Sequence, residues 1–307
     1  MREHRVAVVT AFATYCLLVI GALVHATGSS LACPDWPLCG GRVFPEMVGG
    51  ILFEHGHRLA ALAVAVLTVA LAAIIWRRHR DAHLRALAAL AVVLLLFQAA
   101  LGAITVLLRL PLIVSAGHLT TSMAFFCLMI YLAWRLRPEP VPALRGAPRH
   151  LAGFAVAAVF AQIVLGALVR HTGSGMACGI DVLFCHGSLW PGDGPGRLLS
   201  SHRIAGALVF ALVLATAVPA WQVTRAAGRR AGCLLAAAAP LLVIAQISLG
   251  LLTVTTYISV PVVTAHLAVG ALLLADVWAL LLSFGPGGAS AEVAGGDRRP
   301  GFAPVVG

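Results

Sequence analysis

The chain has 307 residues, of which 61% are hydrophobic and only 10% are charged, with a formal net charge of +10. A soluble domain is nearer one-quarter charged, so this composition excludes a soluble globular protein and predicts an integral membrane protein. The positive charge alone would fit a nucleic-acid partner, but its placement indicates membrane topology instead, and we expect no nucleic-acid binding.

Apolar runs long enough to cross a bilayer as helices occur eight times along the chain. They cover residues 6–26, 51–76, 86–108, 111–134, 151–170, 198–223, 232–256 and 260–284. The first run follows Arg2 and Arg5 and could be taken for a signal peptide, but its end recurs inside the chain, so we expect it to be retained. The sequence thus predicts an all-α integral membrane protein with eight transmembrane helices.

Arginine clusters predict the orientation of these helices. With the N-terminus inside, every cluster falls on the cytoplasmic side, which is the positive-inside pattern. The clusters are Arg2 and Arg5; Arg77, Arg78, Arg80 and Arg85; Arg135, Arg137, Arg145 and Arg149; Arg225, Arg229 and Arg230; Arg298 and Arg299. We therefore expect a protein of the cell membrane with both termini cytoplasmic.

The chain contains a long internal repeat. The segment 21–29, Gly-Ala-Leu-Val-His-Ala-Thr-Gly-Ser, returns at 166–174 as Gly-Ala-Leu-Val-Arg-His-Thr-Gly-Ser, and His57-Arg58 returns as His202-Arg203. A fixed long period indicates a duplicated unit. The prediction is two tandem four-helix bundles, residues 1–140 and 141–285. Residues 286–307, rich in Gly, Ala and Pro, form a disordered cytoplasmic tail in this interpretation.

Four of the seven cysteines form two pairs in equivalent loops on the predicted outer face, Cys33 with Cys39 and Cys178 with Cys185. Disulfides persist on an oxidising face, so we expect each pair to be bonded. A zinc site with His186 as an extra ligand is the competing interpretation, but two thiolates per loop are too few for a closed tetrahedral site. A redox-active pair stays open.

One histidine lies at a common depth in every even-numbered span, about 10 Å below its outer end. These residues are His57, His118, His202 and His266. An ionisable group inside a span usually has a functional role, although a single histidine can also be a polar helix contact. Two facing imidazoles per half fit axial ligation of haem iron within a four-helix bundle.

Small residues stand four positions after each histidine, which would clear the helix face for a flat macrocycle or simply permit close packing. They are Ala61, Ser122, Gly206 and Gly270. Arg58 and Arg203 follow two of the histidines and are candidate contacts for haem propionates, with snorkelling to lipid headgroups as the alternative.

The halves differ at Glu54, which lies one helical turn before His57 and is replaced by Leu199 in the second half. An electron carrier needs no acid or base, whereas an enzyme needs a group that moves protons or stabilises positive charge. We therefore interpret the first half as the reaction site, with Glu54 catalytic, and the second half as a permanent redox haem site. The alternative is that Glu54 only pairs with Arg58.

The chain resembles the haem A synthase family in four features. They are the run Glu54-x-x-His57-Arg58, the duplicated unit, the paired loop cysteines and the motif Gln-x-x-Leu-Gly at Gln98, Gln162 and Gln246. The resemblance implies oxidation of the C8 methyl group of haem O to a formyl group, giving haem A for terminal oxidases. It implies that His57 and His118 bind the iron of substrate haem beside Glu54. It implies that His202 and His266 ligate a b-type haem, and Cys33 and Cys39 match the family's loop pair.

Under the resemblance, the partners are haem O, handed over by a haem O synthase, an unidentified electron partner and the lipid bilayer, with homo-oligomerisation left open. The main alternative is a di-haem electron-transfer protein of the membrane cytochrome b type, which predicts no role for Glu54. A transporter is a weaker reading because the repeats have the same topology and no helix shows a broken midplane site.

Overall fold

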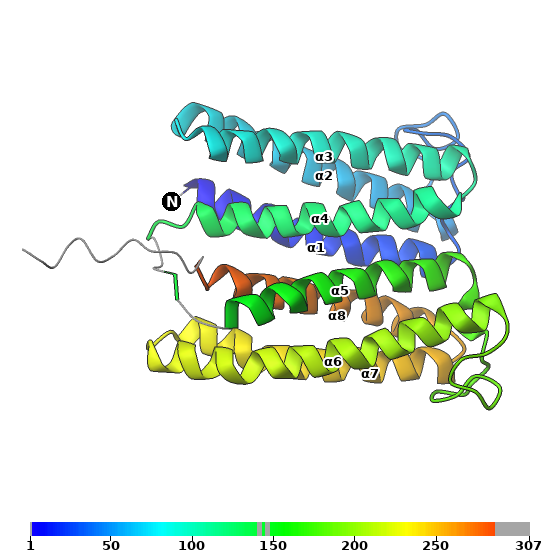
Figure 1. Ribbon diagram of the computed structural model, residues 1–307. Coiled ribbons are helices and arrows are strands. Elements are labelled where there is room, and N and C mark those ends of the chain that lie inside the picture. The colour runs from blue at the N-terminus through cyan, green and yellow to red at the C-terminus, as the bar shows by residue number, and fades with distance from the viewer. Residues whose placement is uncertain (1, 140–142, 145–147, 286–307) are drawn as a thin grey trace, which may run out of the picture.

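The computed structural model describes residues 2–139, 143–144 and 148–285, so the predicted tail at 286–307 lies outside the described residues. Within this part the protein consists of eight long helices and one short 3-10 turn (Figure 1). The helices are α1 (Arg2–Ala26), α2 (Gly49–Arg78), α3 (Ala82–Leu107), α4 (Leu112–Arg135), α5 (Pro148–His171), α6 (Gly194–Ala226), α7 (Arg230–Thr255) and α8 (Val260–Leu282).

All eight helices are long and apolar enough to cross a membrane, and the described residues form no strand beyond isolated bridges. The predicted fold class is therefore confirmed. The helices α1, α3 and α6 begin four residues earlier than expected, and an aspartate caps α3 and α6. Asp81 accepts hydrogen bonds from the amides of His83 and Leu84 at the start of α3, and Asp193 accepts one from Gly196 in α6.

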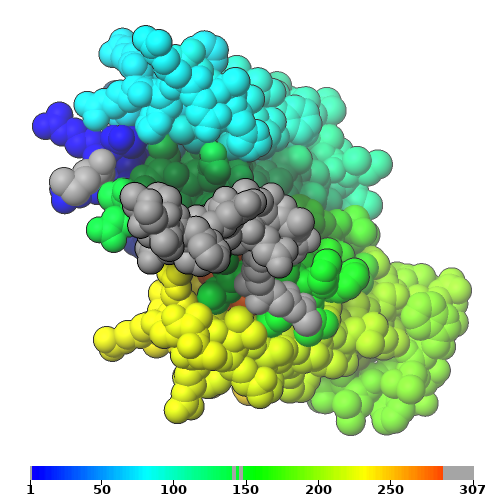
Figure 2. Space-filling view, turned by 60° about the vertical axis from the view of Figure 1, so that its left-hand side comes forward, coloured from blue at the N-terminus to red at the C-terminus, as the bar shows by residue number. Residues whose placement is uncertain are grey.

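Each half of the chain forms a bundle of four helices, with α1–α4 in one and α5–α8 in the other (Figure 1). The two bundles meet where α1 packs on α8 and α4 packs on α5 and α8. The pairs α2–α3 and α6–α7 lie on opposite flanks, which the space-filling view shows in cyan and yellow (Figure 2). A hydrophobic cluster crosses the interface, joining Leu18, Met123 and Phe126 to Val213 and Leu274.

Equivalent turns in the two halves share unusual backbone geometry. The α3–α4 turn has two consecutive residues with positive φ, Arg109 at 57° and Leu110 at 64°. The α7–α8 turn repeats this with Tyr257 at 52° and Ile258 at 60°. Side chains other than glycine rarely adopt this conformation, so its recurrence favours the duplication inferred from the sequence.

Both cysteine-bearing loops, which connect α1 to α2 and α5 to α6, lie at the same end of the molecule, called here the disulfide end (Figure 1). The N-terminus lies at the opposite end. At the disulfide end the two halves also touch directly, because the rings of His25 and His171 stack with centroids 4.7 Å apart. Arg170 donates a hydrogen bond to the His25 carbonyl oxygen at 3.2 Å.

Candidate functional site

The four intramembrane histidines lie six to eight residues into α2, α4, α6 and α8, and thus at one level near the disulfide end. The structure brings them together in pairs within each half. The His57 side chain lies near that of His118, and the His202 side chain lies near that of His266. All four side chains are half-buried between helices. Each bundle thus presents two neighbouring imidazoles, which are nitrogen donors suited to iron.

A glycine on the preceding helix accommodates each of these imidazoles. A Cβ atom on Gly21 would lie 3.1 Å from Cε1 of His57, and one on Gly166 would lie 3.0 Å from Cε1 of His202. The corresponding distances are 3.5 Å for Gly102 and His118, and 3.2 Å for Gly250 and His266. Gly21, Gly166 and Gly250 therefore let their helices approach the next helix more closely than a residue with a Cβ atom would, whereas a Cβ atom on Gly102 would make an ordinary van der Waals contact.

Glutamine side chains contact three of the four histidines. Gln162 Nε2 lies 3.1 Å from His202 Nδ1 and donates to the His202 carbonyl oxygen at 2.8 Å. Gln246 Nε2 lies 3.2 Å from His266 Nε2. With its amide oriented to satisfy its neighbours, Gln98 Nε2 lies 2.9 Å from His118 Nδ1. The glutamines are recognisable in the sequence as a repeated motif, but their contacts with the histidines are seen only in the structure.

Three of the small residues that follow a histidine by four positions, Ser122, Gly206 and Gly270, face a glutamine. A Cβ atom on Gly206 would lie 3.3 Å from Gln162 Nε2, and one on Gly270 would lie 3.2 Å from Gln246 Nε2. In the first half Ser122 hydrogen-bonds the Gln98 amide at 2.9 Å. These small residues therefore make room for an amide beside the imidazole, in addition to the role proposed for them toward a macrocycle.

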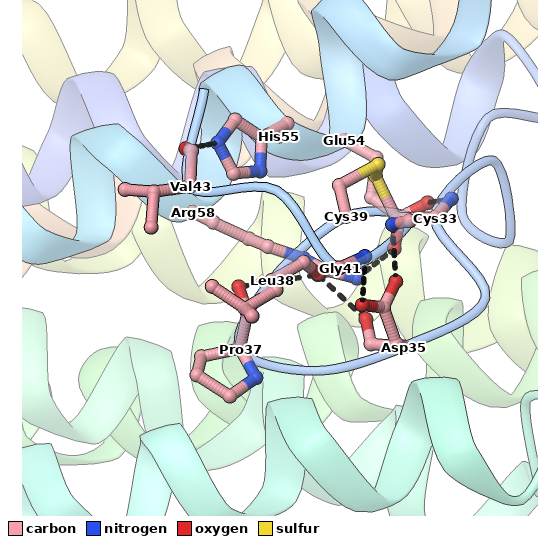
Figure 3. The surroundings of a disulfide bond; sticks show 11 residues. Cys33, Asp35, Pro37, Leu38, Cys39, Gly41, Val43, Glu54, His55 and Arg58 are labelled. Atoms are coloured by element: carbon pink, nitrogen blue, oxygen red, sulfur yellow. Dashed lines mark hydrogen bonds and ion pairs between the residues drawn. A yellow bond between two sulfur atoms is a disulfide. The ribbon is translucent and has the colours of Figure 1, made fainter. Parts of the chain in front are cut away.

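Glu54 is buried beneath the first disulfide loop rather than exposed between the helices (Figure 3). Its Oε1 forms an ion pair with Arg58 Nη2 at 2.6 Å, and its Oε2 accepts a hydrogen bond from the Cys33 amide at 2.8 Å. The Glu54–Arg58 pairing considered as an alternative in the sequence analysis is thus present. It does not by itself decide the role of Glu54, because each carboxylate oxygen keeps a second lone pair.

Arg58 is directed into the loop, where its Nη1 donates to the carbonyl oxygens of Asp35 at 2.7 Å and Leu38 (Figure 3). The Asp35 carboxylate in turn accepts hydrogen bonds from the amides of Gly41 and Gly40. The bond from Gly41 has the largest effect, and together with the Gly40 bond and the nearby Arg58 charge it holds the pKa of Asp35 below its usual value. Arg58 therefore organises the loop, and a propionate contact by this residue remains only a prediction.

The second half presents a different arrangement at the same place. Leu199 replaces Glu54 and is buried against the Cys178–Cys185 disulfide. Arg203 has one carbonyl partner, Phe184, at 3.3 Å, while its Nη2 is buried and has no hydrogen-bond partner among the described residues. An unpartnered guanidinium edge at this depth suits a carboxylate of a bound ligand, which supports the propionate role predicted for Arg203.

Both loop cysteine pairs are joined as disulfides, Cys33–Cys39 and Cys178–Cys185. The His55 ring approaches the first pair closely enough for these three residues to resemble a metal site, but bonded sulfurs supply no thiolate ligands. His55 Nε2 instead lies 2.9 Å from the Val43 carbonyl oxygen and fixes the end of the loop. His186, the extra zinc ligand considered above, lies 3.0 Å from the Ala177 carbonyl oxygen.

The two disulfides should contribute equally to stability but not equally to the site. Each closes a loop of similar length, with sequence separations of 6 and 7, so replacing either pair by serine should cost about 2 kcal/mol of unfolding free energy. Only the Cys33–Cys39 loop holds Glu54, so only its loss should expose Arg58 and Glu54 to solvent. Denaturant unfolding and hydrogen exchange of the two double variants would test this; equal exchange at Glu54 in both would contradict it.

Comparison with known proteins gives concordant matches. Residues 4–278 match the family model COX15-CtaA, described as a cytochrome oxidase assembly protein. A protein named Heme A synthase from Symbiobacterium thermophilum is 34% identical over 275 residues, 85% of this chain and 87% of that protein. Another of the same name from Bacillus pumilus is 32% identical over 215 residues, 66% of this chain and 70% of that protein.

A different name appears among the matches. A Protoheme IX farnesyltransferase from Halobacterium salinarum is 32% identical over 145 residues, which are 46% of this chain but only 32% of that longer protein. The similarity therefore covers a minor part of the archaeal protein.

Proposed function

Since the chain belongs to the COX15-CtaA family of cytochrome oxidase assembly proteins, as its sequence motifs indicated, we propose that it is a haem A synthase. It is an enzyme acting on haem, and the reaction we assign is oxidation of the C8 methyl group of haem O to a formyl group. The site assignment rests on one observation. Each half has a pair of neighbouring histidines, and only the pair in the first half has a carboxylate, Glu54, one helical turn away.

The second half fits a resident b-type haem. His202 and His266 would hold its iron, and the buried, unpartnered Nη2 of Arg203 would meet a propionate. When bound, this haem would supply one-electron transfer. The glycines against both imidazoles and the glutamine beside each keep these rings in place, which is what a permanently bound group requires.

The first half takes the substrate. His57 and His118 bind the iron of haem O, whose isoprenoid tail favours entry from the lipid phase. Conversion of the methyl group to an aldehyde removes four electrons and four protons and incorporates the oxygen atom of one water, through two hydroxylations and loss of water. Glu54 accepts a proton from the methyl carbon or stabilises the positive charge that develops there.

We assign the disulfide end to the outer face of the cell membrane and the arginine-rich end to the cytoplasm. Haem O would come from a haem O synthase. The match to part of a longer archaeal protein named Protoheme IX farnesyltransferase supports a close link between the two steps. An electron partner is required by the reaction, and the family match favours this enzyme over the di-haem carrier considered above.

The experiment that tests the function is haem extraction and mass analysis of the purified protein, expressed with and without a haem O synthase. We expect haem B alone without the synthase, and haem O plus haem A with it. Two equivalents of haem B that do not change on co-expression would overturn the assignment and favour the electron carrier.

A glycine substitution tests the resident haem site. Gly166→Ala places a methyl group 3.0 Å from His202 Cε1, so the ring must move away, and we expect retained haem b to fall about tenfold. Gly153→Ala on the same helix has nothing within 4 Å of its new Cβ and serves as the matched control. Haem b per protein, measured after purification, should be unchanged in the control; equal loss in both variants would contradict the packing argument.

A further inference from the structure

The four histidines occupy equivalent positions in the internal repeat, but the residues on the neighbouring helices that pack beside them differ. On three odd-numbered helices a glutamine stands four residues before the glycine that packs on the imidazole, and on α1 a leucine takes that place. The pairs are Gln98 and Gly102, Gln162 and Gly166, Gln246 and Gly250, and Leu17 and Gly21. Leu17 is related to Gln162 by the same offset of 145 that relates His57 to His202.

The consequence is visible at His57. An amide lies within 3.2 Å of a ring nitrogen of each of the other three histidines. The His57 Nδ1 is buried and has no hydrogen-bond partner in the part of the chain that the structure describes, and no amide contacts its ring. The His266 Nδ1 is likewise buried and unpartnered there, but Gln246 lies at the other ring nitrogen, Nε2. An aliphatic side chain offers neither a donor nor an acceptor, so Leu17 cannot supply one.

A histidine that ligates a metal normally uses its second ring nitrogen in a hydrogen bond, which fixes the ring and strengthens the ligand. A glutamine amide can serve, because its oxygen accepts an N–H once the amide is turned. In Gln162 and Gln246 that oxygen is buried and unpartnered within the described residues. Removing such a partner typically weakens metal binding by about 10- to 100-fold.

We propose that Leu17 makes His57 the exchangeable ligand of the substrate haem, while Gln98 holds His118 as its anchoring ligand. The inference deepens the proposed function and rests on it. It also explains the distribution of glutamines: both ligands of the resident haem have one, whereas only one ligand of the substrate haem does. A haem that enters and leaves in each cycle needs one weakly bound ligand. A permanently bound haem is held best when both of its ligands are strong.

The test uses carbon monoxide, which replaces a weakly held axial ligand of reduced haem. The full-length protein is purified with haem from cells that make haem O, reduced, and mixed with carbon monoxide while the absorption change is followed. We expect only the first-half haem to bind it. Leu17→Gln should slow this binding about tenfold or more, and Leu17→Met, of similar length but without an amide, should bind at nearly the original rate.

A second variant approaches the same question from the other ligand. Gln98→Leu removes the amide beside His118, so both first-half ligands should become weak, and the substrate haem retained after purification should fall about tenfold. This variant keeps the proposal testable if the Leu17→Gln protein does not accumulate. Retention of substrate haem at the original level in Gln98→Leu would overturn the proposal.

Two results with the Leu17 variants would contradict the proposal. An unchanged carbon monoxide rate in Leu17→Gln, or equal slowing in Leu17→Gln and Leu17→Met, would overturn the proposal. Failure of the proposed function would appear differently, as a protein that binds no haem O at all, before any rate is measured.

Discussion

Replacing His202 by alanine is expected to reduce resident haem b to less than about a tenth of its original amount. The imidazole is one of two neighbouring imidazoles in the second bundle, and loss of a direct ligand should exceed the 10- to 100-fold cost of losing a hydrogen-bond partner. His266→Ala should have the same effect. Haem extraction from purified protein, normalised to protein content, measures both.

The first half supplies an internal control for this prediction. His118→Ala should leave haem b in place and abolish retention of haem O, because the two imidazole pairs belong to separate bundles. His57→Ala should also leave haem b in place but should lower retention of haem O less than His118→Ala does. His150→Ala, an exposed histidine at the start of α5, should change neither haem. Loss of haem b from His57→Ala, with His202 intact, would show that the halves have been assigned the wrong groups.

Glu54→Gln is expected to retain both haems yet lower the rate of haem A formation by about 10²- to 10⁴-fold. The amide keeps the shape of the side chain and can still accept from the Cys33 amide, but it cannot accept a proton or stabilise positive charge. Haem composition over time in cells that supply haem O gives the rate. Glu46→Gln, in the same loop but exposed, is the matched control.

Arg58 separates a chemical role of Glu54 from a structural one. If Glu54 served only to anchor Arg58 and the loop, Arg58→Gln would impair haem A formation as severely as Glu54→Gln. We expect the Arg58 variant to destabilise the loop while retaining more activity than Glu54→Gln. Full formyl production by Glu54→Gln would remove Glu54 from the mechanism.

The helices and their equivalence could be read from the sequence. Backbone groups inside a bilayer must be hydrogen-bonded within their own segment, so apolar runs of sufficient length predict helices whatever their neighbours are. The boundaries erred where local capping by Asp81 and Asp193 extended α3 and α6 past the apolar windows. The repeat likewise identified His57, His118, His202 and His266 as one set, because equal spacing on equivalent helices places side chains at equal depth.

The glutamines and glycines could have been recognised in part from the same repeat. Their spacing recurs on three odd-numbered helices, and aligning the fourth would have shown Leu17 as the exception. What the spacing could not show is that Gly166 faces His202 and that Gln162 reaches its ring, because such contacts depend on the rotation and separation of two helices.

The sequence by itself determined the membrane class, eight helices, the duplicated plan, four histidines at one level and a carboxylate in one half only, since these follow from local chemistry and periodicity. The tertiary structure alone decided which partners those groups meet. In the structure Glu54 and Arg58 lie under the first disulfide loop. Among the described residues the Arg203 Nη2 has no hydrogen-bond partner, and no amide contacts the His57 ring. Apart from the Glu54–Arg58 pair, which lies within one helix and could be anticipated from its spacing, these contacts depend on packing between segments far apart in the chain.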